Sequence, residues 1–211
     1  MLLLLLPGMD GTGDLFAPFV NAAPPNFEPR VVRLPDAGNY DELHDAVAAH
    51  VPRDGAFAVL AESFSGPLAL ELARRHPDRV RAVILCNTFI AAPRWWLRFV
   101  PWRVLLAVRA PRSMVQFLFG WGDAARVIRS VDGSLMAVRL RAIAMLSVVP
   151  RVKCPVLYLR GTKDRLVSRA SVERILRVMP EVVVKEIDGP HLLLQVRANE
   201  AWAAIGEFVM R

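Results

Sequence analysis

Short apolar runs alternate with amphipathic stretches along most of this chain. Six runs hold few polar residues, as is typical of strands that are buried on both faces of a sheet. They lie at residues 2–6, 30–34, 56–61, 80–86, 156–160 and 182–187. The stretches between them carry apolar side chains at helical spacing, at residues 14–22, 40–51, 67–75, 171–179 and 192–209. The alternation predicts an α/β protein with a mostly parallel sheet of about six strands and helices on both faces.

Residues 89–150 interrupt this alternation, because they contain no strand-like run. Prolines in this segment stand where first helical turns begin, and residues 134–148 form a longer helical pattern. We therefore expect an all-helical cap, or lid, at residues 89–150, inserted into a core made of residues 1–88 and 151–211.

The composition fits such a buried sheet. Hydrophobic residues make up 54% of the 211 positions, which excludes a disordered chain. No run reaches the roughly 18 apolar residues of a membrane span, and residues 2–6 lack the basic start of a signal peptide. Cys86 and Cys154 are expected near opposite ends of adjacent strands, too far apart for a disulfide. Two free thiols favour a reducing compartment, so we expect a cytoplasmic protein.

The formal net charge is +7, and it is unevenly distributed. Residues 89–152 hold ten basic and two acidic side chains, so this segment carries +8 and the rest of the chain −1. Arginine outnumbers lysine 24 to 3, which is typical of a codon bias, so we expect no nucleic-acid partner. Arginines interleaved with aromatic residues are typical of helices that touch anionic lipid, so contact of the cap with a lipid surface is the alternative. These arginines are Arg94, Arg98, Arg103, Arg109 and Arg112.

Residues 59–66 contain the most informative motif. An apolar run stops at Ser63, between Ala61 and Ser65, and a helical pattern begins at once. A strand that turns sharply into a helix lifts the serine hydroxyl clear of the backbone, as in the Gly-x-Ser-x-Gly motif of serine nucleophiles. Ala61 and Ser65 replace the two glycines and are small enough for such a turn. The alternative is an ordinary serine at a helix N-cap.

A serine nucleophile needs a base, and the base needs an acid that orients it. Asp164 and His191 each follow an expected strand, so the order along the chain is Ser63, Asp164, His191. Loops at the carboxyl ends of parallel strands converge at one edge of the sheet. Asp188 competes as the acid, and either carboxylate alone fits a structural turn. The remaining histidines fit the base less well, and they are His44, His50 and His76.

The strand expected at residues 2–6 leads into a glycine-rich loop at residues 7–13. Glycines let a backbone N–H approach a ligand closely. We therefore expect the N–H groups of Met9 and Phe64 to form an oxyanion hole. A phosphate-binding loop is the alternative, but this loop has neither a Gly-x-Gly-x-x-Gly order nor a Gly-Lys-Ser/Thr sequence.

Four segments together resemble the α/β-hydrolase superfamily, at residues 7–11, 61–66, 161–164 and 189–191. The resemblance extends over essentially the whole chain and departs from the family pattern at two points. Pro7 stands where the family often has histidine, and the chain begins at the first parallel strand, without the N-terminal antiparallel hairpin. The resemblance implies an α/β-hydrolase fold, trimmed to about six strands, with a helical cap over the active site.

The resemblance implies a serine esterase that cleaves carboxylic esters of small to medium apolar acyl groups through an acyl-enzyme intermediate, with no metal or cofactor. A thioesterase, acyltransferase, lactonase or C–C hydrolase on the same triad is the alternative, as is a non-catalytic ligand-binding protein. Several residues of the cap would line an apolar acyl pocket, unless they pack the cap onto the sheet. They are Trp95, Trp96, Phe99, Trp102, Met114, Phe117 and Phe119.

Overall fold

The structure, a computed structural model, describes residues 1–92, 99–100, 112–122, 126–127, 131–149 and 151–209. Within these ranges six strands form one parallel sheet in the order β2-β1-β3-β4-β5-β6. The strands are β1 (Leu2–Leu6), β2 (Glu28–Val31), β3 (Phe57–Glu62), β4 (Val80–Cys86), β5 (Val156–Gly161) and β6 (Val183–Ile187). The predicted class, strand number and parallel pairing are confirmed. β2 begins earlier than predicted, because Glu28 already pairs with Leu2 of β1.

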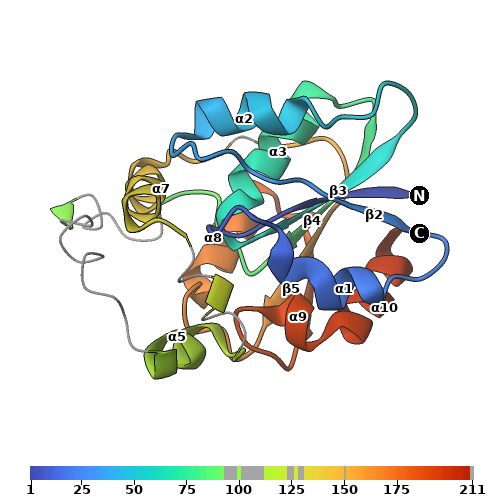
Figure 1. Cartoon of the computed structure of the whole chain (residues 1–211). Coiled ribbons are helices and arrows are strands. Elements are labelled where there is room, and N and C mark those ends of the chain that lie inside the picture. The colour runs from blue at the N-terminus through green and yellow to red at the C-terminus, as the bar shows by residue number, and fades with distance from the viewer. Residues whose placement is uncertain (93–98, 101–111, 123–125, 128–130, 150, 210–211) are drawn as a thin grey trace.

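Successive strand residues point to opposite faces of the sheet, so each face has a core of its own. Leu4 and Val59 pack on one face, and Leu5 and Leu60 pack on the other. Helices on the first face are α2 (Tyr40–Ala48), α3 (Gly66–Arg75) and α8 (Arg169–Val178). Helices on the second face are α1 (Ala17–Asn21), α9 (Leu193–Val196) and α10 (Ala198–Val209). Figure 1 shows α2 and α3 above the sheet and α1, α9 and α10 below it.

The segment between β4 and β5 contains the helices α5 (Arg112–Phe119) and α7 (Gly133–Met145), and we name residues 89–150 the insertion. Both helices lie at the end of the molecule opposite the chain termini (Figure 1). Asp132 caps α7, because its carboxylate accepts hydrogen bonds from the first backbone N–H groups of the helix. α7 also packs closely on the loop before α2, since a Cβ at Gly38 would lie 2.0 Å from Val138 Cγ1.

Both cysteines are free thiols, as predicted, and Cys86 is buried. The tail predicted as one helix is two, because α9 ends before Arg197 and α10 begins at Ala198. Among the described residues we find no helix with the length and hydropathy that crossing a bilayer requires.

Candidate active site

The strand order brings five loops to one edge of the sheet. β1 is flanked by β2 and β3, so the chain changes direction between β1 and β3. Such a switch point is where open parallel sheets bind ligands, beside the carboxyl ends of the strands. The strand register aligns the carboxyl ends of β1, β3 and β4, because Leu6 pairs with Ala61 and Glu62 pairs with Cys86. Loops after β1, β3, β4, β5 and β6 therefore meet at this edge.

Ser63 stands directly after β3, at the start of a short 3-10 helix, η2 (Ser63–Ser65). Its φ is +50°, a left-handed conformation that a serine keeps only where its surroundings hold it. The Thr88 hydroxyl donates a hydrogen bond to the Ser63 carbonyl. A side chain at Gly66 would collide with Thr88, because a Cβ there would lie 2.1 Å from its Oγ1. The turn predicted at Ser63 is thus present and fixed by contacts.

Ser65 occupies the last glycine position of the motif. Its hydroxyl donates a hydrogen bond to the Pro7 carbonyl, in the loop after β1. Glycine could not make this bond. The substitution noted in the sequence therefore links the turn at Ser63 to the loop that carries Met9.

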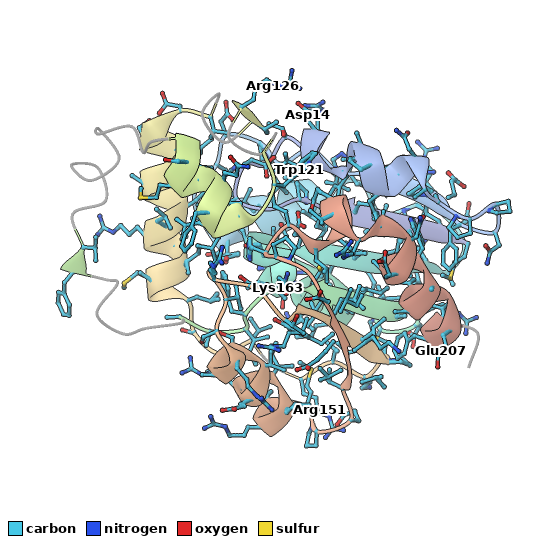
Figure 2. The ribbon with its side chains drawn as sticks, turned by 90° about the horizontal axis from the view of Figure 1, so that it is seen from below. Asp14, Trp121, Arg126, Arg151, Lys163 and Glu207 are labelled. Atoms are coloured by element: carbon cyan, nitrogen blue, oxygen red, sulfur yellow. The ribbon has the colours of Figure 1, made fainter. Side chains whose placement is uncertain are left out.

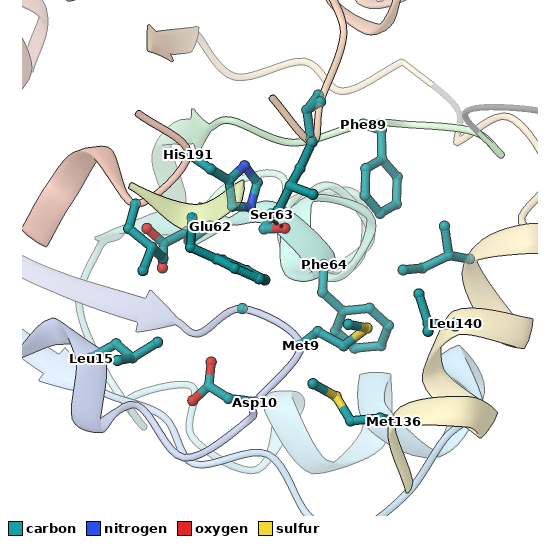
Figure 3. Close-up of a pocket in the computed structure, with 16 residues that line it drawn as sticks. Met9, Asp10, Leu15, Glu62, Ser63, Phe64, Phe89, Met136, Leu140 and His191 are labelled. Atoms are coloured by element: carbon teal, nitrogen blue, oxygen red, sulfur yellow. Dashed lines mark hydrogen bonds between the residues drawn. The ribbon is translucent and has the colours of Figure 1, made fainter. Parts of the chain in front are cut away.

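His191 lies between Ser63 and Asp164. Its Nε2 is 3.0 Å from Ser63 Oγ, and its Nδ1 is 3.0 Å from each Asp164 carboxylate oxygen. An ionised carboxylate only accepts hydrogen bonds, so Nδ1 carries the proton and Nε2 accepts the bond from the Ser63 hydroxyl. Figure 3 shows the His191 ring directed at Ser63.

The Asp164 side chain is 2% exposed and is fixed by the backbone of its own loop. The N–H groups of Leu166 and Val167 donate to Asp164 Oδ1 at 2.8 and 3.1 Å. Asp188, the competing acid, lies elsewhere: its side chain is 64% exposed and is bonded to Thr162 and Lys163. The hydrogen bond from Lys163 lowers the pKa of Asp188 below its usual range. The structure therefore favours Asp164 as the partner of His191.

Asn87, directly after β4, connects the loops of Asp164 and His191, and the sequence analysis missed it. Its amide donates to the carbonyls of Pro190 and His191 at 3.1 and 2.8 Å, and accepts from the Gly161 N–H at 2.8 Å. Asn87 is 1% exposed and has a φ of +44°. A polar residue at the end of a buried strand was the available signal.

Met9 and Phe64 flank Ser63 and carry the two expected oxyanion donors. Both residues line the cavity in front of Ser63. A tight turn, closed by a hydrogen bond from Gly11 N–H to the Gly8 carbonyl, presents Met9 at this position. The arrangement fits an oxyanion hole.

A cavity of about 310 Å³ opens in front of Ser63 and His191. Its described lining is mostly apolar and comes partly from the insertion, which supplies Phe119, Met136, Leu140 and Ile143. Figure 3 shows Met136 and Leu140 reaching from α7 toward Met9 and Phe64. Trp121, which follows α5, packs near Leu15 with Phe119, and Figure 2 shows it close to the N-terminal segment.

Phe119 was expected in the pocket and lines the cavity. For Met114 and Phe117 the expectation is corrected. They are 47% and 60% exposed and do not line the cavity, because α5 turns Val115 inward and these side chains outward. Phe117 packs against the Arg165 guanidinium instead, 4.0 Å from its ring centroid. Phe99 is 71% exposed and also lies outside the lining. Trp95, Trp96 and Trp102 lie outside the described residues, as do Arg94, Arg98, Arg103 and Arg109.

Glu62, next to Ser63, is a buried carboxyl beside the cavity. Gln195 Nε2 donates to its Oε2 at 3.2 Å. Within the described part of the chain, Glu62 Oε1 and Gln195 Oε1 have no hydrogen-bond partner. Burial, and then the charge of Asp10, raise the pKa of Glu62 to about 8. Among the described residues no group of three His, Cys, Asp or Glu side chains is arranged to hold a metal.

No protein-family model matches this chain. In sequence, the chain is similar to polyketide synthase ThaQ of Burkholderia thailandensis, with 28% identity over 226 aligned residues that cover 88% of this chain. The chain spans about 10% of the length of that curated relative. The comparison therefore concerns a small part of a much larger protein.

Solved structures with the same architecture are numerous. A lipase-esterase related protein from Clostridium acetobutylicum has a TM-score of 0.81 at 16% identity, over 98% of this chain and 93% of that one. A thermophilic esterase from Thermogutta terrifontis has a TM-score of 0.78 at 20% identity, over 100% and 89%. The enol-lactonase from Burkholderia xenovorans has a TM-score of 0.76 at 19% identity, over 100% and 91%. At such identities the likeness establishes the architecture, and this chain has the α/β-hydrolase fold.

Proposed function

We propose that this protein is a serine hydrolase that cleaves carboxylic esters of small to medium apolar acyl groups through an acyl-enzyme intermediate. The observation that carries the proposal is the chain of hydrogen bonds from Ser63 through His191 to Asp164, at the floor of an apolar cavity. A volume of about 310 Å³ is at the lower end for small-molecule sites, which favours acyl groups of modest size. The esterases among the structural neighbours support the same reaction class.

Acylation begins with the Ser63 hydroxyl. His191 Nε2 takes its proton as Oγ attacks the ester carbonyl carbon, and the carbonyl oxygen becomes an oxyanion. The N–H groups of Met9 and Phe64 stabilise that charge, at positions fixed before the substrate arrives. Asp164 keeps the His191 proton on Nδ1 and stabilises the imidazolium that forms. His191 then gives a proton to the leaving alcohol.

Deacylation repeats these steps with water. His191 Nε2 takes a proton from a water molecule, which attacks the acyl carbon attached to Ser63 Oγ. The oxyanion of this second intermediate accepts hydrogen bonds from the same two N–H groups. Collapse of this intermediate returns the proton to Ser63 and releases the carboxylic acid, so the free enzyme is restored.

The test is turnover of p-nitrophenyl esters with acyl chains from two to sixteen carbons. Wild-type protein is expected to prefer short to medium chains. Ser63→Ala is expected to lose about 10⁴-fold or more in kcat, while Ser168→Ala, an exposed serine before α8, keeps full activity. A fluorophosphonate probe should label Ser63, as mapped by peptide mass spectrometry. Labelling of another serine, or turnover by Ser63→Ala at the wild-type rate, rejects the proposal.

Thioester hydrolysis is the second candidate, favoured by the similarity to part of a polyketide synthase. The same nucleophile and oxyanion donors serve a thioester carbonyl, and a thiol is a better leaving group than an alcohol. Comparing kcat/KM for butyryl esters of an alcohol and of a thiol, with leaving groups of similar size, decides between the two. A preference for the thiol ester by more than about 100-fold, beyond the intrinsic difference in hydroxide hydrolysis, favours the second candidate.

A further inference from the structure

Arg139, in the middle of α7, is the largest fully buried side chain described, with an exposed fraction of 0%. A buried guanidinium is costly unless its N–H groups are paired. Its acceptors among the described residues are main-chain carbonyls. Nη1 donates to Met9 O at 2.7 Å, Nη2 to Pro35 O at 2.7 Å, and Nε to Ala37 O at 3.2 Å. One side chain of the insertion thus joins two loops of the core.

The guanidinium touches both residues whose N–H groups form the proposed oxyanion hole. It bonds to the carbonyl of Met9, and its Cζ lies 5.8 Å from the centroid of the Phe64 ring. Tyr40 supports Phe64 from another side, because its ring stacks on Phe64 at 5.0 Å and its hydroxyl donates to the Phe64 carbonyl. A displacement of Arg139 would therefore shift both residues that carry the oxyanion donors.

The loop after β1 is shaped to admit this side chain. Gly11 has a φ of +73°, and a Cβ there would lie 2.5 Å from Arg139 Nη1. The Gly11 carbonyl accepts a hydrogen bond from Leu34 N–H, which joins the same two loops. Arg139 also shares a face of α7 with Met136 and Ile143, which line the cavity, since they stand three and four positions from it.

We propose that Arg139 is a positioning residue for the oxyanion hole, and that it makes the geometry of Met9 and Phe64 depend on the seating of α7. This inference rests on the proposed function for its catalytic consequence. Its structural part, that an arginine of the insertion fixes a loop of the core, is independent of the proposed function. The rival explanation is that Arg139 only anchors the insertion and forms part of the cavity wall.

Kinetics of Arg139→Met and Arg139→Lys separate the two explanations. Arg139→Met keeps the length of the side chain and removes its donors, so kcat should fall about 10- to 100-fold, less than the 10²- to 10³-fold typical of a lost oxyanion donor. KM should change less than about threefold, and Arg139→Lys should fall between. Arg141→Met, an exposed residue of the same helix, is the matched control and should retain wild-type kinetics. A raised KM with unchanged kcat supports the rival and overturns the proposal.

The affinity of an oxyanion mimic is a second measurement, which a purely anchoring role of Arg139 would leave unchanged. A butyl boronic acid forms a tetrahedral adduct with a serine and places an oxygen in the oxyanion hole. Its affinity should fall by the same factor as kcat/KM in Arg139→Met, while the affinity of butyrate, which forms no adduct, stays within about threefold. Unchanged boronate affinity in a folded variant overturns the proposal. Should Arg139→Met fail to fold, as judged by circular dichroism, the Arg139→Lys series provides the same comparison.

Hydrogen exchange tests the positioning without turnover. In Arg139→Met, exchange at residues 8–13 should accelerate relative to wild type, while residues 156–161 of β5 stay unchanged. Accelerated exchange with no esterase activity in the wild type counts against the proposed function alone. Unchanged exchange at residues 8–13 overturns the role of Arg139, whatever the activity.

Discussion

The two sides of Ser63 are held by different parts of the chain. One side, the proton-transfer side, consists of His191 and Asp164. These residues come from the loops after β6 and β5, and Asn87 after β4 bonds to both loops. All three positions belong to the core. The end of α5 also packs on the His191 loop, because Leu192 N–H donates to the Phe119 carbonyl at 3.2 Å and the Phe119 ring lies 5.7 Å from the His191 ring.

The other side, the oxyanion side, consists of the N–H groups of Met9 and Phe64. Ser65 holds the Met9 loop from the core, and Arg139 holds it from α7 of the insertion. The oxyanion side therefore requires both the sheet and a correctly seated insertion. The difference indicates that changes in α7 would alter acyl specificity and oxyanion stabilisation together, whereas the proton-transfer side meets the insertion through α5.

Asp164→Asn should give the largest effect of any substitution on the proton-transfer side. Two backbone N–H groups hold Oδ1, so the new amide nitrogen would replace Oδ2 and donate to His191 Nδ1. The proton of the imidazole would then move to Nε2, which could no longer accept from Ser63. We expect kcat to fall about 10⁴-fold with the fold intact, as for the equivalent change in other triads. Steady-state kinetics with a p-nitrophenyl ester measure it.

Asp188→Asn is the matched control for this change. Asp188 stands three positions from His191 in sequence, but it is bonded to Lys163 at the surface. Its replacement should leave kcat within about twofold of wild type. If Asp188→Asn caused the large loss and Asp164→Asn did not, the acid of the proton-transfer side would be misassigned.

Asn87→Asp should give the next largest effect. The carboxylate keeps the shape and can still accept from Gly161 N–H, but it cannot donate to the carbonyls of Pro190 and His191. Two carbonyls would then face an acceptor in a buried site, which typically costs about 1–3 kcal/mol each. We expect kcat/KM to fall about 10- to 100-fold, with boronate affinity falling in parallel because His191 is displaced. Urea unfolding should show the loss of stability, and wild-type values for both would remove Asn87 from this role.

The sequence predicts the core and the proton-transfer side because both depend on short-range patterns. Two-sided burial gives strands such as β1 and β3 continuous apolar runs. Ser63, Asp164 and His191 follow such runs directly, so their position at one edge follows from parallel pairing. Asn87 could have been predicted in the same way, since it too follows a buried strand.

The oxyanion side was harder to predict because part of its support comes from far along the chain. Arg139 lies 130 residues from Met9, and it resembles the other arginines of a basic segment. A charged residue in a helix normally faces water, and nothing local indicates that this one meets three carbonyls. The prediction for Met114 and Phe117 was wrong for a similar reason: the sequence indicates helices in this segment but does not say which apolar side chains face the cavity.

Double-mutant cycles sharpen the comparison of the two sides. Ser65→Ala removes one hydrogen bond to the Met9 loop and should lower kcat about 3- to 10-fold, near the 1 kcal/mol of a typical bond. Ser65 and Arg139 hold the same loop, so Ser65→Ala and Arg139→Met should couple by about 0.5–3 kcal/mol. Ser65→Ala and Asn87→Asp act on different sides and should be additive within about 0.5 kcal/mol. Equal coupling in both cycles would mean that the two sides form one unit.

Glu62→Gln should have the smallest effect on activity and a clear effect on stability. Glu62 is a buried carboxyl. Its pKa is raised by burial and by the charges of Asp10 and Asp164, and Asp10 lies on the Met9 loop. A neutral Glu62 brings no charge into this buried site and still accepts the hydrogen bond from Gln195 Nε2. An amide is also neutral, so kcat at neutral pH should stay within about threefold of wild type.

The stability of Glu62→Gln relative to wild type should depend on pH. The folded pKa of Glu62 is about 8, above the 4.5 of an unperturbed glutamate, so the folded state binds the proton more tightly. Wild type therefore keeps full stability below pH 4.5 and loses it as the pH rises toward 8, by roughly 3–5 kcal/mol in all. Urea unfolding from pH 5 to 8.5 should show Glu62→Gln gaining on wild type by that order, while Glu173→Gln, an exposed control, shows a constant difference. A constant difference for Glu62→Gln as well would mean that the carboxyl is already charged in the folded protein, and that both sides of Ser63 contain a buried anion.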